Sequence, residues 1–171
     1  CNQYNREMIY RFRIILDNDT EDDIFRDIEI TKNSTLEDFH KSIFNSFGFN
    51  NNEIASFYLS DNEWAQGEEI SLFNFGDENE KKKLMSKTSI DEVVTIENNK
   101  LIYIYDFLNM WTFLIELIEI AEEVNEVSYP NIIFSKGDIP EKAPERKFES
   151  DKDEIVNDED FENYNEEQDY Y

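Results

Sequence analysis

Side chains that could carry out chemistry are scarce in this sequence. His40 is the only histidine and Cys1 the only cysteine. A catalytic nucleophile needs a neighbouring base, and a zinc site needs about four His, Cys or carboxylate ligands. Because His40 falls beside the apolar stripe of an expected helix, we interpret it as a packed structural residue. We assign no catalytic residue, no metal ligand and no cofactor.

Carboxylates are abundant, and two groups of them invite a chemical interpretation. The run from Asp17 to Asp23 resembles a calcium loop only in its acidity, since an EF-hand needs Gly at its sixth position and Glu at its twelfth. Asp22 and Ile28 stand there, so we expect a solvated hairpin loop. Asp106 ends an apolar strand and either closes a turn or serves as a site residue. An enzyme that uses Asp106, with or without a divalent metal, remains an alternative.

Aromatic side chains are the other candidates for contact with a ligand or partner. Trp64, Tyr105 and Trp111 join Asp106 in this set, because aromatic residues anchor interfaces. Packing in the core is the competing interpretation, above all for Trp111. The four glycines are far apart and form no phosphate-binding loop.

The net charge of −25 restricts the possible partners. Nucleic acids reward clustered Lys and Arg, and this chain offers no basic stripe, so we expect no direct nucleic-acid binding. An anionic membrane would repel the chain for the same reason. The expected partner is a basic protein, while a small-molecule ligand is left open.

A single cysteine permits no intrachain disulfide, which fits the reducing cytoplasm. Cys1 could alternatively be the lipidated first residue of a bacterial lipoprotein, and Met8 is a plausible native start. The most apolar run, 101–121, is interrupted by acidic residues and is a poor transmembrane candidate.

Hydrophobic periodicity predicts the elements that position these residues. Residues 9–16 alternate, with Arg11 and Arg13 on the polar face, and predict a half-buried strand. Further strands are expected at 24–31, 55–60 and 69–73, the first of them forming a hairpin with 9–16. The charged range 77–87 indicates a loop of low order, and 89–94 a single helical turn.

The strongest helix signal covers residues 35–47. Ser34 and Glu37 have the spacing of a capping box. Large apolar residues then recur at helical spacing, and Gly48 supplies the end of the helix.

Residues 101–106 are apolar on both faces, as in a central strand. Residues 111–120 alternate, although a helix over 106–124 fits the same periodicity. Asn109 favours a tight turn, so we predict a hairpin. The order β-β-α-β…β-β predicts an α+β fold with a mixed or largely antiparallel sheet and a principal helix packed on it.

The chain divides into three parts by composition. Residues 1–8 form an N-terminal extension and residues 9–147 a single α+β domain. Residues 148–171 hold eleven acidic residues against Lys152, and we expect an acidic disordered tail there.

Three segments carry a resemblance to a known family. They are Tyr10 to Ile14 with the helix that ends in Phe47-Gly48-Phe49, Tyr103 to Phe107 followed by Trp111, and Tyr129-Pro130 leading to Gly137 and Ala143-Pro144-Glu145. In this order and spacing the chain resembles the plasmid pRi "open reading frame three"-like family. The resemblance implies an α+β fold and an association with plasmids and transposable elements, and it implies no established activity. Leu108 to Met110 stand where the family usually continues with Gly-Asp.

These observations favour a non-enzymatic protein-interaction module that binds through a sheet edge or the acidic tail. An accessory or passenger protein of a plasmid or transposable element is the second hypothesis. The carboxylate- or metal-dependent enzyme comes last.

Overall fold

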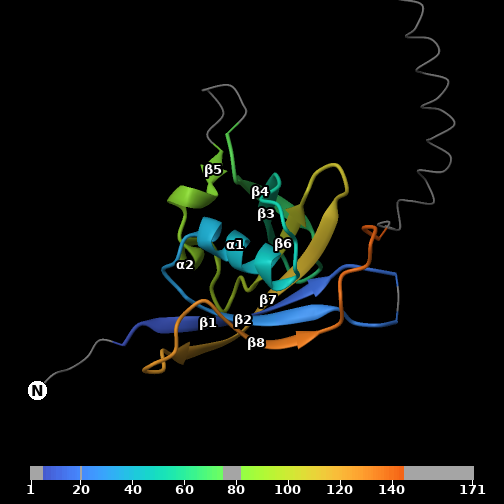
Figure 1. Cartoon of the computed structure of the whole chain (residues 1–171). Helices are drawn as coiled ribbons and strands as arrows, with labels where there is room; N and C mark the ends of the chain where they lie inside the picture. Colours follow the sequence, from blue (N-terminus) through green and yellow to red (C-terminus); the bar gives the residue numbers. More distant parts are fainter. Residues whose placement is uncertain (1–5, 20, 75–81, 145–171) are drawn as a thin grey trace, which may run out of the picture.

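The structure, a computed structural model, describes residues 6–19, 21–74 and 82–144. A single sheet and a principal helix dominate it (Figure 1). In chain order the elements are β1 (Met8–Leu16), β2 (Phe25–Thr31), α1 (Leu36–Ser46), β3 (Ala55–Ser60), β4 (Gln66–Ser71), β5 (Lys83–Leu84), the 3₁₀ helix η1 (Met85–Lys87), α2 (Ile90–Val93), β6 (Lys100–Tyr105), β7 (Trp111–Glu122) and β8 (Asn131–Lys136).

The sheet has the strand order β5-β4-β3-β6-β7-β1-β2-β8. The pair β4–β5 is parallel and the other pairs are antiparallel. The α+β class with a mixed sheet is therefore confirmed, with a low helix content. The predicted order of elements was incomplete, because it omitted β5, η1 and β8.

Helix α1 begins one residue later than its capping signal predicted. The cap is Thr35 and not Ser34: its Oγ1 accepts a hydrogen bond from the backbone N–H of Asp38 at 3.1 Å. The Ser34 hydroxyl instead lies against Thr31 Oγ1. Gly48 follows the last turn with φ +82°, a conformation that costs glycine little, so the predicted end of the helix is correct.

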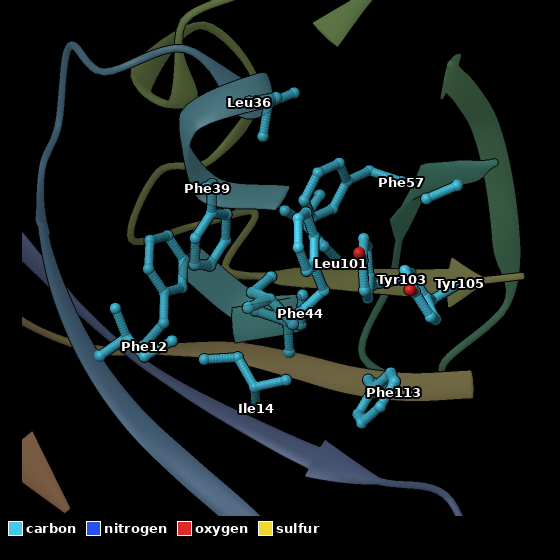
Figure 2. Packing of buried hydrophobic residues seen from close by; sticks show 14 of the residues in the cluster. Phe12, Ile14, Leu36, Phe39, Phe44, Phe57, Leu101, Tyr103, Tyr105 and Phe113 are labelled. Atoms are coloured by element: carbon cyan, nitrogen blue, oxygen red, sulfur yellow. The ribbon is translucent and has the colours of Figure 1, made fainter. Parts of the chain in front are cut away.

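One stripe of α1 packs on one face of the sheet, which we call the helix face. Phe39 of α1 lies between Phe12 of β1 and Phe57 of β3, with ring centroids 4.6 and 5.6 Å away. Figure 2 shows Phe57 beside Tyr103, whose ring centroid is 4.9 Å from that of Phe57. Each buried aromatic side chain contributes on the order of 1.5–3 kcal/mol, so this cluster supplies much of the driving force for folding.

The opposite face of the sheet, which we call the far face, carries the polar residues of the alternating strands. Arg11 pairs with Glu29 at 2.9 Å, and Arg13 pairs with Asp27 at 2.8 Å. These cross-strand pairs join β1 to β2, as the predicted hairpin requires.

Arg26 breaks the apolar pattern of the helix face. Its guanidinium is buried and donates to the carbonyl oxygens of Phe25, Ser46, Lys136 and Gly137 at 2.8–3.1 Å. Burial lowers the pKa of Arg26 from its ordinary value. The side chain thus ties β2 to the end of α1 and to the end of β8.

Of the remaining predictions from the sequence, some are correct and others are wrong. Residues 106–124 form a hairpin and not a helix, with Tyr105 opposite Trp111. Strand β8 was missed, and the range 77–87 contains β5 and η1 in its described part. Met8, which the composition placed in the N-terminal extension, is the first residue of β1. The predicted acidic tail lies outside the described residues.

We expect Thr35→Ala to lower the free energy of unfolding by about 1 kcal/mol, because it removes the acceptor that caps α1. Thr35→Ser keeps a hydroxyl acceptor and should retain most of the stability. Urea unfolding followed by circular dichroism measures both variants. Equal losses in the two would show that the hydroxyl of residue 35 does not cap the helix.

Candidate functional site

Asp106 occupies a turn and forms hydrogen bonds within it. Its backbone has φ +61°, and its carboxylate accepts from the Leu108 backbone N–H at 3.1 Å and from Asn109 Nδ2 at 2.6 Å. Both carboxylate oxygens therefore hold the β6–β7 turn in shape. This geometry matches the structural interpretation of Asp106 in the sequence.

Tyr105 and Trp111 flank that turn, but they point to the helix face. Both are buried, and both contact the ring of Phe49, with centroids 4.5 and 5.2 Å away. The Tyr105 hydroxyl donates to the carbonyl oxygen of Asn51. These two candidate contact residues are thus core residues.

Trp64 lies apart from the other three candidates. It is in the β3–β4 connection with φ +63°, and its ring is 5.6 Å from Lys100 Nζ, at the opposite end of β6 from Tyr105. The structure therefore gathers three of the four predicted residues at one hairpin and leaves the fourth elsewhere.

His40 is enclosed in the core, as its sequence position suggested. Its Nδ1 lies 2.6 Å from the Tyr103 hydroxyl and its Nε2 lies 2.7 Å from Asn52 Oδ1. Because Asn52 Oδ1 can only accept, Nε2 carries the proton and Nδ1 accepts from Tyr103. Burial lowers the pKa of His40 below its ordinary value of 6.5, so the ring is neutral in the folded protein at neutral pH.

A cavity of about 260 Å³ opens on the far face over β3 and β4, and we call it the far-face pocket. The register places its floor residues together, since Ser56 pairs with Ser71 and Tyr58 pairs with Glu69. Partners in an antiparallel pair point to the same face. The apolar residues between them, Phe57 and Ile70, point to the core.

Glu69 is the acidic group among the described residues that line this pocket. One carboxylate oxygen accepts from Ser56 Oγ at 2.7 Å and from Tyr58 Oη at 3.3 Å. The other lies 3.7 Å from Lys82 Nζ, which is longer than a normal hydrogen bond. The two hydroxyls thus fix the carboxylate against the sheet.

Apolar side chains form the rim of the far-face pocket. Ile54, Phe73 and Phe107 line it, and each is 40–49% exposed. No residue of the pocket was predicted from the sequence. The signal that could have indicated the pocket is the alternation of Ser56 and Tyr58 with inward apolar residues, together with a second alternation at 69–71.

Strand β8 forms the edge of the sheet beside β2, and it is unusually apolar. Ile132, Ile133 and Phe134 are 46%, 39% and 51% exposed. Phe134 stacks on Phe25 with a centroid distance of 5.5 Å. Within the described parts of the chain, no strand pairs with the outer edge of β8.

Two further observations concern metals and membranes. Nowhere in residues 6–19, 21–74 and 82–144 do three His, Cys, Asp or Glu side chains gather as a metal site would require. In the same ranges no helix is long and apolar enough to cross a membrane.

This geometry defines an α+β protein in which one principal helix packs on a mixed eight-stranded sheet with a pocketed far face and an apolar edge, in the part of the chain that is described. The chain belongs to the family described as plasmid pRiA4b ORF-3-like protein, which matches residues 8–168. The resemblance found in the sequence is therefore confirmed.

A solved structure shares the fold. The crystal structure of MM3350, a protein of unknown function from Methanosarcina mazei Go1, has a TM-score of 0.69 and 24% sequence identity. The similarity covers 80% of this chain and 75% of that chain. Comparison with curated proteins gave no match.

The neutral His40 predicts a specific pH dependence of stability. Because its folded pKa lies below the unfolded value of 6.5, the unfolded chain binds the proton first, and stability falls as the pH drops below that value. The contribution of His40 is lost between its unfolded pKa and its lower folded pKa, and below the folded pKa it no longer changes with pH.

Urea unfolding of the native protein and of His40→Gln, from about pH 7.5 to about pH 5.5, tests this expectation. The variant should show a shallower pH dependence, whatever its absolute stability, since the carboxylates contribute equally to both. Identical slopes would contradict a neutral, buried imidazole.

Proposed function

We propose that this chain is a non-enzymatic protein-interaction module that binds a basic partner segment along β8. The observation that carries this proposal is the row of three exposed apolar residues, Ile132 to Phe134, on an edge strand. Edge strands of soluble proteins are usually protected by charges, prolines or short length. A bare apolar edge is instead suited to receive an added strand from a partner.

The surroundings of β8 favour a partner with basic ends. Glu126 lies in the connection that precedes β8, and Asp138 and Glu141 follow its end. An extended segment with an apolar centre and Lys or Arg on both sides would place apolar side chains on β8 and charges near these carboxylates. Complementary charges of this kind raise specificity and the rate of association.

The environments of Asp106 and His40, the residues of the sequence best suited to chemistry, support a binding function over catalysis. The carboxylate of Asp106 accepts hydrogen bonds within its own turn, and the ring of His40 is enclosed by Tyr103 and Asn52. The ring of His40 is fully buried and is not presented to a substrate. The charge of −25 and the single cysteine suit a module that acts in the cytoplasm on basic proteins.

The family offers a second candidate, an accessory role for a plasmid or transposable element. Its description as plasmid pRiA4b ORF-3-like is the observation that favours this role. The two candidates are compatible, because an accessory protein can act by binding. Mobile-element genes beside the gene for this chain would support the second candidate, and their absence would weaken it.

A synthetic peptide with a Val- and Ile-rich centre and lysines at both ends is the probe for the proposed function. We expect it to bind and to protect the backbone amides of residues 131–136 from hydrogen exchange. Ile133→Lys, which places a charge on the edge, should weaken binding about tenfold, that is by about 1.4 kcal/mol. Fluorescence anisotropy at low and moderate salt measures the affinity.

Ile96→Lys is the matched control, since it also replaces an exposed isoleucine by lysine but lies outside β8. It should leave the affinity nearly unchanged. A second peptide with glutamates at its ends should bind much more weakly. Equal loss in both variants, or protection of amides outside β8 and β2, would overturn binding at this edge.

A further inference from the structure

We propose that the far-face pocket is a binding site for a small organic cation, a primary alkylammonium group with a short apolar body. This site is separate from β8, since β3 and β4 lie near one end of the strand order and β8 ends it on the other side. The inference therefore does not depend on the proposed function.

Glu69 supplies the counter-charge for such a cation. Ser56 and Tyr58 donate to one of its oxygens and hold the carboxylate in place. The second oxygen is 3.7 Å from Lys82 Nζ, so an incoming ammonium can approach it at hydrogen-bond distance. Because these hydrogen bonds already order the Glu69 side chain, the entropic cost of binding a ligand is lower.

Ser71 supplies an independent indication of a polar ligand atom. Its side chain lines the pocket and the residue is 7% exposed. Among the residues that the structure describes, its hydroxyl has no hydrogen-bond partner. Buried hydroxyls are nearly always satisfied, and an ammonium held by Glu69 carries further N–H donors that the Ser71 oxygen can accept.

The rim matches the rest of the ligand. Phe73 and Phe107 expose aromatic rings at the mouth, and aromatic faces attract organic cations. Ile54 adds an aliphatic surface for an alkyl chain. The volume of about 260 Å³ is slightly below the usual range of about 300–1,000 Å³ for small-molecule sites, so the ligand is short.

Charge favours a cation over an anion in this pocket. Lys82 is the one basic residue that lines it among the described residues, and its side chain, 43% exposed, can turn toward solvent when an ammonium pairs with Glu69. An anion would meet the carboxylate and the field of a chain with net charge −25. An ammonium ion is attracted by both, and it has to displace only the exposed ammonium group of Lys82.

The test is a titration with n-butylammonium, followed by the backbone amide resonances of the ¹⁵N-labelled protein. We expect saturable shifts at Ser56, Glu69 and Ser71. The neutral isostere n-butanol should bind at least about tenfold more weakly. Equal binding of the two compounds, or no saturable shift at millimolar concentrations, would overturn the site.

Variants separate the pocket from the general field of the protein. Glu69→Gln should reduce the affinity about tenfold or more, because hydrogen bonds to a charged group are the strong ones. Glu68→Gln is the matched control: it removes the same charge from the neighbouring position, which does not line the pocket and whose side chain is 52% exposed. Equal losses in the two variants would show a nonspecific attraction and defeat the proposal.

Phe107→Leu gives a second test in case Glu69→Gln perturbs folding. The residue is on an exposed turn, and leucine keeps bulk while it removes the aromatic face. Binding of the cation should weaken by about threefold to tenfold, with little effect on n-butanol. Unchanged cation binding in Phe107→Leu would refute the part assigned to the rim.

The ammonium group could come from a free amine or from a lysine side chain of a partner. Titration with N-acetyl-lysine methylamide distinguishes these sources, because it presents the lysine side chain between two peptide groups. Tighter binding than n-butylammonium would indicate a partner's lysine, and weaker binding a free amine. Ile133→Lys should not alter either titration. The pocket and the proposed binding at β8 are therefore tested independently of each other.

Discussion

Burial of one stripe of α1 against the sheet is the constraint on which the rest of the structure depends. Phe39 contacts Phe12 and Phe57 from two strands far apart in the sheet order, so the sheet must bring both strands to the same helix. Once those rings point to the helix face, alternation sends the neighbouring residues to the far face. The same constraint therefore assigns every strand residue to one of two environments.

The far-face pocket is a consequence of that assignment. With Phe57 and Ile70 committed to the core, Ser56, Glu69 and Ser71 have to meet on the other side of β3 and β4. A register slip of one residue would send these polar side chains inward and expose the apolar ones, which is energetically prohibitive. The hydroxyls that hold Glu69 are thus positioned by the packing of the opposite face.

Local patterns in the sequence predicted the elements whose signal is contained within a few residues. The alternation of β1 and the stripe of α1 belong to this class, and so does the hairpin that follows Asp106. The cap of α1 was misplaced by one residue because Ser34 and Thr35 are both good caps, and a hydrogen bond to Thr31 engages the first. Strand β8 was missed because Ile132 to Phe134 do not alternate; its pairing with β2 has a register shift there.

The candidate site was harder to predict, for a physical reason. Tyr105 and Trp111 have the residue types of an interface, yet their register opposite each other on the helix face buries them against Phe49. Conversely, Ser56 and Glu69 are ordinary polar residues in sequence, and only the pairing of β3 with β4 joins them. Chemistry that depends on nonlocal pairing leaves no local signature in a single sequence.

Electrostatics affects both proposed binding surfaces, the edge at β8 and the far-face pocket. The basic residues Arg11, Arg13 and Lys100 of the far face are engaged by Glu29, Asp27 and Glu116. Their charges are therefore offset locally and do little to reduce the excess of carboxylates elsewhere on the chain. Exposed ion pairs contribute little to stability, so the excess of carboxylates mainly affects the recognition of partners. A cationic partner meets a negative field over the whole approach, and the geometry of the edge or pocket then decides where it binds.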